Sequence, residues 1–201
     1  MKLLDSKFYS ILLFISNIFL LNIIWLVMCL PLITIFPATA AMFGVVRQWV
    51  VHKDVSIFAP FFRYFKENLK QSLLLEVIWV FLAAFLVIDY TIALKMGFSQ
   101  SIILPILFVI SFLFLLGSVF LFPTMVQFNT TTGKILKNTL LLAISYFPIT
   151  LILCLVTVLI AFILYIFPLS ILFIFSAGAY CSYFLCHFAF KRVTQVNVSE
   201  T

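Results

Sequence analysis

The chain has 201 residues, of which 66% are hydrophobic and 9% are charged, and its formal net charge is +6. Soluble domains are about 45–50% apolar and about 25% charged, so this composition excludes a water-soluble globule, and it excludes a disordered chain for the same reason. The apolar runs are continuous, whereas strands of a transmembrane barrel alternate apolar and polar residues. The composition therefore predicts an all-α membrane protein, a polytopic helix bundle.

Long apolar runs in chain order predict the spans, because about 20 apolar residues cross a bilayer as a helix. Three such runs cover residues 8–30, 73–94 and 101–126. A fourth, residues 139–190, has 52 residues without Asp, Glu, Lys or Arg, enough for two spans with a turn at Phe167 and Pro168. We expect one transmembrane domain over residues 1–190 and a polar C-terminal tail over 191–201.

Residues 37–51 leave the number of membrane segments open. Fifteen residues make a helix of about 22 Å, which is short for a hydrocarbon core of about 30 Å. The segment is either a re-entrant or interfacial helix, which gives five full spans, or a short return helix, which gives six. In the second case Arg47 would reach the inner surface by snorkelling.

The basic residues favour six segments. Five spans place nine Lys and Arg inside and three outside, whereas six place eleven inside and one outside, as the positive-inside rule prefers. The chain then forms three hairpins, with both termini in the cytoplasm. Each return helix has a proline near its outer start, where the missing N–H costs little: Pro37, Pro105 and Pro168.

The segment at about 55–71 is predicted to be a cytoplasmic amphipathic helix, because apolar residues recur at helical spacing and basic residues occupy most of the other face. Such a helix lies on the inner membrane surface, with phenylalanines in lipid and lysines against anionic head groups. The alternative is a docking element for a partner. The candidate lipid or partner contacts are Phe58, Phe61, Phe62, Arg63, Phe65, Lys66 and Lys70.

Polar residues inside the predicted spans are candidates for function, because they are costly in lipid. They are Asn17, Asn22, Trp25, Arg47, Glu76 and Asp89. Glu76 and Asp89 lie 13 residues apart, about 20 Å along a helix, so they cannot form one acid/base pair. We expect Glu76 to anchor its helix end or to pair with Arg47 or Lys70, with a transport or proton-relay role as the alternative. The two asparagines either hold helices together or contact a substrate.

Two pairs of small residues, Ala40 with Gly44 and Gly178 with Ser182, have the spacing that allows close helix approach. No catalytic, nucleotide or cofactor motif is recognisable. Cys181, Cys186 and His187 fit no zinc spacing, and no basic groove indicates a nucleic acid. The sequence therefore predicts no metal, no cofactor and no nucleic-acid partner, and nothing in it indicates the oligomeric state.

A set of short motifs resembles the YesL-type family of small bacterial membrane proteins of unknown function. The motifs are LNIIW at 21–25, LPLIT at 30–34, PATAA at 37–41 and FFRYFKENLKQ at 61–71. The resemblance covers about residues 15–75, and Phe36 stands where many members have Gly. It implies a bacterial cell membrane and a frequent genomic setting beside carbohydrate ABC uptake systems. It supplies no catalytic residues.

Three functional hypotheses follow. The first is a non-enzymatic accessory protein of a carbohydrate ABC uptake system or a related envelope process, with sugar ABC transporter subunits and the lipid bilayer as partners. The second is a small solute permease acting as an oligomer, which requires Glu76, Asp89, Asn17 and Asn22 to face one cavity. The third is an enzyme acting on lipid or cell-wall precursors.

Overall fold

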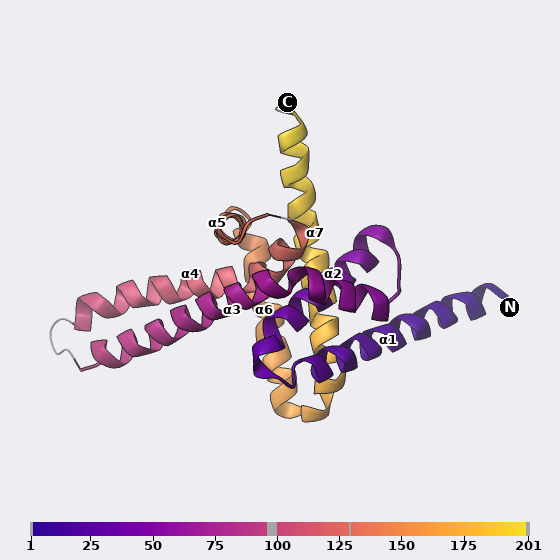
Figure 1. The fold of residues 1–201 in the computed structure, drawn as a ribbon, viewed down its shortest axis with the longest axis horizontal. Helices are drawn as coiled ribbons and strands as arrows, with labels where there is room; N and C mark the ends of the chain where they lie inside the picture. The colour runs from indigo at the N-terminus through magenta and orange to yellow at the C-terminus, as the bar shows by residue number, and fades with distance from the viewer. Residues whose placement is uncertain (1, 96–99, 129, 200–201) are drawn as a thin grey trace.

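The computed structural model describes residues 2–95, 100–128 and 130–199, and this part of the chain is helical with no strand. Its elements, in order, are α1 (Lys2–Met28), η1 (Leu32–Thr34), α2 (Ile35–His52), α3 (Phe58–Ala93), α4 (Gln100–Gln127), α5 (Thr132–Ser145), α6 (Phe147–Ile166), η3 (Pro168–Leu172) and α7 (Ile174–Ser199). Figure 1 shows the α3–α4 hairpin and the α6–α7 hairpin leaving a common centre in different directions.

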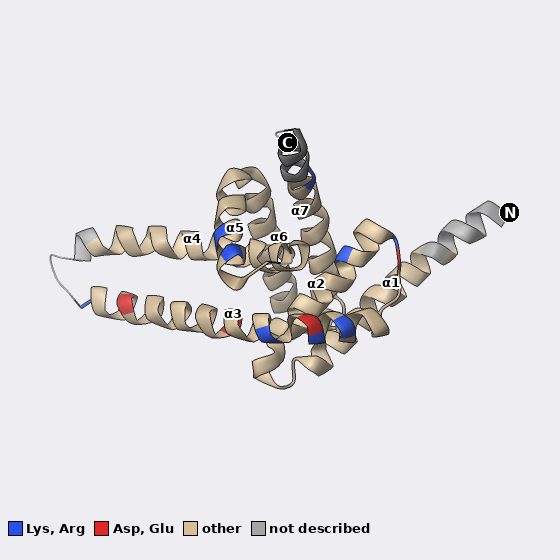
Figure 2. Cartoon of the chain, turned by 45° about the horizontal axis from the view of Figure 1, so that its top comes forward, with Lys and Arg blue, Asp and Glu red and all other residues tan. Residues whose placement is uncertain are grey.

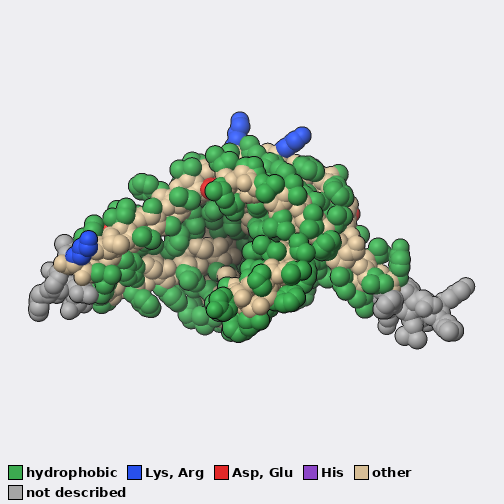
Figure 3. All heavy atoms as spheres, turned by 90° about the horizontal axis from the view of Figure 1, so that it is seen from below, with side chains coloured by type: hydrophobic (Ala, Val, Ile, Leu, Met, Phe, Trp, Pro, Cys, Tyr) green, Lys and Arg blue, Asp and Glu red, His purple; other side chains and the backbone are tan. Residues whose placement is uncertain are grey.

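The surface confirms a helical membrane bundle. Within the described residues, five helices are long and apolar enough to span a bilayer: α1, α2 with η1, α3, α4 and α6. Large apolar side chains such as Phe81, Leu155 and Val158 stand exposed, and Figure 3 shows them covering a face that is hollowed in the middle. Soluble monomers rarely expose apolar surface on this scale. α7 is long but more polar, so the sixth segment stays a prediction.

α2 is the central helix of the molecule. It packs against α1, α3, α4 and α7, and 61% of its most apolar window is buried, compared with 11–22% in the other four candidate spans. Small residues allow this packing, because Ala38, Ala40 and Ala41 are fully buried. A Cβ on Gly44 would lie 2.7 Å from the Tyr64 ring, so α2 and α3 are in close contact there. The segment that the sequence left open therefore faces protein more than lipid.

α3 differs from the two elements predicted for this region. The expected amphipathic helix at about 55–71 and the span at 73–94 are one continuous helix of 36 residues, about 54 Å long. Its first half packs on α2, and its second half packs on α4, where Trp79 Nε1 donates to Ser118 Oγ at 2.9 Å. The helix is longer than the hydrocarbon core, so an upright α3 with its apolar second half in lipid extends its polar first half beyond the core.

The region after α4 also differs from the prediction. The apolar stretch from residue 139 does not continue as one helix, because α5 ends at Ser145 and α6 begins at Phe147, with Pro148 in its first turn. α5 is amphipathic and buries Ile135, Thr139, Leu142 and Ala143. The predicted turn at residues 167–168 is confirmed, since α6 ends at Ile166 and η3 begins at Pro168.

The three prolines fall in different places. Pro37 lies in the first turn of α2, as predicted, whereas Pro168 begins η3 and the return helix α7 starts only at Ile174. Pro105 lies inside α4, because that helix begins at Gln100. Both predicted small-residue pairs mark close helix contacts: Gly44 meets Tyr64, and Gly178 meets the side chain of Ile160.

Candidate functional site

A buried amide organises the linker between α2 and α3. Gln48 is 5% exposed, and its Nε2 donates to Asp54 Oδ2 at 2.8 Å and to Ser56 Oγ at 3.0 Å. Its Oε1 accepts from Tyr64 Oη and Arg63 Nη2, both at 3.4 Å. One uncharged residue thus fixes the linker and the start of α3 on the core helix.

Asp54 closes this linker as a local turn. Its Oδ1 accepts from the backbone N–H of Ser56 at 3.0 Å and from the Ser56 hydroxyl at 2.8 Å. These hydrogen bonds, with smaller contributions from Arg63 and His52, lower the pKa of the Asp54 carboxyl, because they stabilise its charged form. The linker therefore carries a fixed negative charge whose oxygens are already bound.

Arg47 lies one residue before Gln48 and joins α2 to two other helices. Its Nε donates to Gln127 Oε1 at 3.3 Å, at the end of α4. The same oxygen accepts a 2.7 Å hydrogen bond from the Tyr183 hydroxyl of α7. Arg47, Gln127 and Tyr183 thus connect α2, α4 and α7 through polar side chains.

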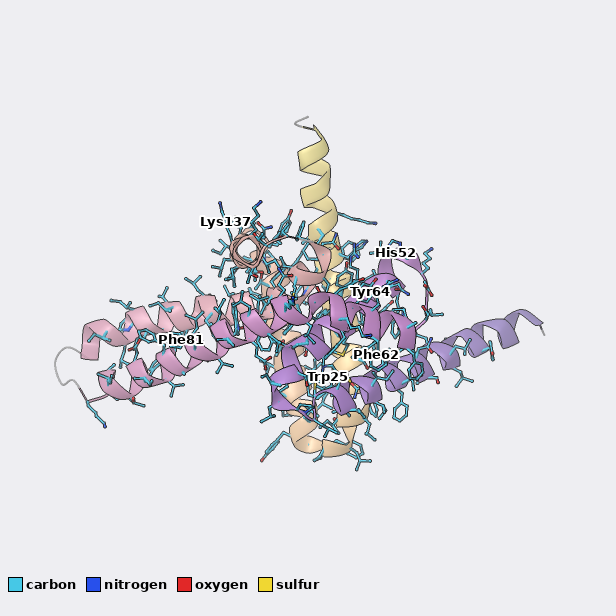
Figure 4. The ribbon with its side chains drawn as sticks, viewed as in Figure 1. Trp25, His52, Phe62, Tyr64, Phe81 and Lys137 are labelled. Carbon is cyan, nitrogen blue, oxygen red and sulfur yellow. The ribbon has the colours of Figure 1, made fainter. Side chains whose placement is uncertain are left out.

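A polar cavity of about 490 Å³ opens beside this contact. It is lined by Arg47, Tyr64, Glu67, Asn68, Gln71, Met125, Val126 and Gln127. Two amides hold its wall, because Asn68 Nδ2 donates to Tyr64 O at 2.9 Å and Gln71 Nε2 donates to Thr130 O at 2.7 Å. In Figure 4, Tyr64 lies at the junction of α2 and α3, whereas Phe81 lies out on the α3–α4 hairpin.

The candidate contacts on α3 divide between two sides of the helix. Phe61 is fully buried, Phe65 is half-buried, and their rings stack at 6.5 Å. This corrects the prediction that Phe61 contacts lipid or a partner, because α2 covers that side of α3. The others are exposed, namely Phe58, Phe62, Arg63, Lys66 and Lys70, and Arg63 forms an ion pair of 3.9 Å with Glu67. These five exposed residues are called the outer face of α3 below.

Asn22 and Trp25 connect α1 to other helices. Asn22 is fully buried; its Nδ2 donates to Ile171 O at 2.7 Å, and its Oδ1 accepts from Ser176 N at 3.0 Å. Trp25 Nε1 donates to Thr39 Oγ1 at 3.1 Å. Both hydrogen-bonding sides of the Asn22 amide are bound, so this residue holds helices together, one of the two roles expected from the sequence.

The other intramembrane candidates do not converge. Glu76 adjoins the backbone N–H of Phe36, and one of its oxygens is buried without a hydrogen-bond partner among the described residues. It pairs with neither Arg47 nor Lys70, which corrects that expectation, because the described part of the chain contains one ion pair, Arg63 with Glu67. Glu76 lines an apolar cavity of about 410 Å³ that contains none of Asn17, Asn22 and Asp89. The cavity that Glu76 lines therefore does not bring these four residues together.

The sequence did not identify the residues that build the polar cavity. Arg47 was a candidate, but the uncharged polar residues that line the cavity with it, among them Tyr64, Asn68 and Gln71, were not, because they lie outside the predicted spans. Gln127 lies just beyond the apolar run 101–126 and was not a candidate, whereas it ends α4 and accepts a hydrogen bond from Tyr183. The sequence signal that could have indicated the cavity was the presence of polar side chains at the ends of the apolar runs.

The chain is similar to two curated proteins of Bacillus subtilis (strain 168). It is 31% identical over 183 residues to "Uncharacterized protein YesL", covering 85% of this chain and 82% of that protein. It is 28% identical over 180 residues to "Uncharacterized protein YteU", covering 87% and 81% respectively. The family model described as "Protein of unknown function, DUF624" matches residues 18–90. No solved structure matches the chain.

Proposed function

The chain belongs to the DUF624 family, the family of YesL and YteU, and on this premise we propose that it is a non-enzymatic accessory protein of a membrane transport complex. The observation that carries the proposal is the outer face of α3. Phe58 is 55% exposed and Phe62 is 44% exposed, and they share the first half of α3 with the exposed residues Arg63, Lys66 and Lys70.

The rigidity of this face supports a docking role. α2 covers the opposite side of α3, where Phe61 and Tyr64 pack, and Gln48 holds Arg63 and the linker. The outer face is therefore presented by a helix whose conformation is already fixed, which reduces the entropy lost on binding. Aromatic residues and arginine are enriched among the residues that dominate binding energy at interfaces. The resemblance found in the sequence implies a frequent genomic setting beside carbohydrate ABC uptake systems, and we take such a system as the proposed partner.

The orientation proposed from the sequence places this face on the cytoplasmic side of a bacterial cell membrane, with both termini cytoplasmic. Figure 2 shows Lys and Arg on α5, on the first half of α3 and near the end of α7, and one basic residue at the tip of the α3–α4 hairpin. That distribution agrees with the positive-inside rule. Cysteine labelling at positions 2, 53 and 95 tests it: the first two are expected to react from the cytoplasm and the third from outside. Opposite labelling at 2 and 53 would instead support five spans.

The proposal is tested by affinity purification from native membranes in mild detergent. We expect sugar ABC transporter subunits to co-purify with the tagged wild-type chain and to be lost from the double variant Phe62→Ala, Lys66→Glu. The matched control is Lys137→Glu, which reverses an exposed charge on α5, away from the outer face of α3 (Figure 4). The proposal fails if no transporter subunit exceeds background, or if the double variant and the control retain the same subunits.

A small oligomeric permease is the alternative retained from the sequence. It needs a polar route through the bilayer, and the residues nominated for it lie apart. The permease hypothesis is tested by solute uptake in cells that carry Glu76→Gln and Asp89→Asn. Uptake equal to that of the wild type would count against a permease.

A further inference from the structure

Arg47 carries a charge that has no counter-ion in the part of the chain that the structure describes. Its guanidinium donates through Nε to the neutral amide oxygen of Gln127, at a long 3.3 Å. Among the described residues, no carboxylate lies within ion-pair distance of it. A guanidinium group offers five N–H donors in a planar fork, and this geometry suits a carboxylate or a phosphate group. Arg47 itself lines the polar cavity, so the guanidinium N–H groups that do not bind Gln127 are close to that space.

The carboxylates near the cavity are engaged elsewhere. Glu67 also lines it, and its carboxylate forms an exposed ion pair with Arg63 at 3.9 Å. The oxygens of Asp54 are bound by Gln48 and Ser56. Neither group neutralises Arg47, so the charge of the cavity wall formed by α2 and α4 stays positive.

Neutral donors surround the same space. The amides of Asn68 and Gln71 each use one N–H on a backbone carbonyl, and each NH2 group has a second N–H. The hydroxyl of Tyr64 points to the junction between α2 and α3 through its contact with Gln48. The cavity volume of about 490 Å³ falls within the range of small-ligand sites.

We propose that the cavity beside Arg47 binds a phosphate group, with the guanidinium as its principal contact. Arginine recognises phosphate through paired, charge-assisted hydrogen bonds, and the Tyr183–Gln127–Arg47 contacts orient the guanidinium before the ligand arrives. Because this end of the bundle also carries the basic residues of α5 and the outer face of α3, the phosphate comes from one of two sources: the head group of an anionic lipid, or a soluble phosphate ester.

A structural role for Arg47 is the competing explanation. Gln127 is the last residue of α4, and a cation near a helix C-terminus is stabilised by the helix dipole. In that case Arg47 would support folding and its removal would leave phosphate binding unaffected. The two explanations differ in whether a phosphate ligand stabilises the protein through Arg47. A stability measurement without added ligand would not separate them.

The test uses the full-length protein in two settings. In neutral detergent, thermal unfolding is followed with inorganic phosphate and with sodium chloride at the same ionic strength. In nanodiscs, phosphatidylcholine alone is compared with phosphatidylcholine containing phosphatidylglycerol. The variants are Arg47→Gln, Arg47→Lys, which keeps the charge but loses the fork, and Lys137→Gln as a control that removes one exposed charge.

We expect phosphate or phosphatidylglycerol to stabilise the wild type and Lys137→Gln equally, and to bind Arg47→Lys at least about tenfold more weakly. Stabilisation by inorganic phosphate assigns a soluble ester, and stabilisation by the anionic lipid alone assigns the head group. The proposal is overturned if neither ligand stabilises the wild type beyond the salt control, or if Arg47→Lys responds as strongly as the wild type. Should Arg47→Gln fail to fold, the wild-type and Arg47→Lys comparisons still decide the outcome.

Discussion

Replacing Asn22 with Ala tests the interpretation of this buried residue as the link between α1 and the start of α7. α7 begins at Ile174. The first backbone N–H of this helix that donates to a carbonyl of the preceding turn is that of Ala177, which donates to Phe173 O. The N–H of Ser176 donates instead to Asn22 Oδ1. An N-capping side chain normally satisfies that position, so an asparagine from a distant helix performs the capping function that Phe173 cannot.

The expected loss follows from two hydrogen bonds. Loss of a capping side chain costs roughly 0.5–2 kcal/mol, and interhelical hydrogen bonds in membrane proteins average about 0.6 kcal/mol. The Ile171 contact is of the second kind. We therefore expect Asn22→Ala to lower the free energy of unfolding by about 1–3 kcal/mol.

The assay is unfolding by sodium dodecyl sulfate in mixed micelles, followed by circular dichroism. Asn17→Ala is the matched control, because Asn17 is a half-buried asparagine on the same helix and makes no side-chain hydrogen bond within the described residues. Its loss should stay within about 0.5 kcal/mol. Equal destabilisation by both variants, or a neutral Asn22→Ala, would refute the capping argument.

Two further predictions concern the contact between α2 and α3. Gly44→Ala should destabilise the protein by about 1–3 kcal/mol, because the new Cβ would lie 2.7 Å from Tyr64 Cγ; Gly133→Ala meets nothing within 4 Å and should be neutral or stabilising by up to about 1 kcal/mol, so the same unfolding assay must rank the two in opposite directions. Asp54 has a lowered pKa, so its contribution is complete above about 3.9, the usual aspartate value, and is lost as the pH falls through its lower folded pKa. Trp49, whose Nε1 donates to Ser56 O at 3.3 Å, reports the linker by fluorescence in a Trp25→Phe, Trp79→Phe background: the signal should change in acid below about pH 3.9, and an unchanged acid titration in Asp54→Asn, compared with its parent, would contradict the assignment.

The sequence predicted the elements whose position depends on apolar composition and on helix-breaking residues. Apolar runs located the spans, and Pro168 located the turn after α6, because neither feature depends on tertiary contacts. The amphipathic segment at about 55–71 and the span at 73–94 were predicted as two elements, whereas the structure has one helix. In the structure Ser72 is buried, and the helix continues because no proline or glycine interrupts it.

Other differences come from packing, which a single sequence does not display. Phe61 and Phe62 are adjacent and chemically identical, yet one is fully buried and the other is exposed, because α2 covers one side of α3. The polar cavity joins α2, α3 and α4, and no spacing along one helix brings Arg47 beside Gln127. The break at Tyr146 had a local signal, Pro148, that the uncharged run obscured.

The central position of α2 has a consequence for how the protein is made. This helix leaves the ribosome before α3, α4 and α7, which supply most of its packing surface, and its mean hydropathy of 1.2 is the lowest among the candidate spans. Lipid is a poor substitute for those later helices, because the hydrogen-bond partner of Arg47 is Gln127 of α4, which has not yet been synthesised. The contacts that join Arg47, Gln127 and Tyr183 form only after α4 and α7 have been synthesised. A change in α7 is then able to disturb the membrane integration of a helix made more than a hundred residues earlier.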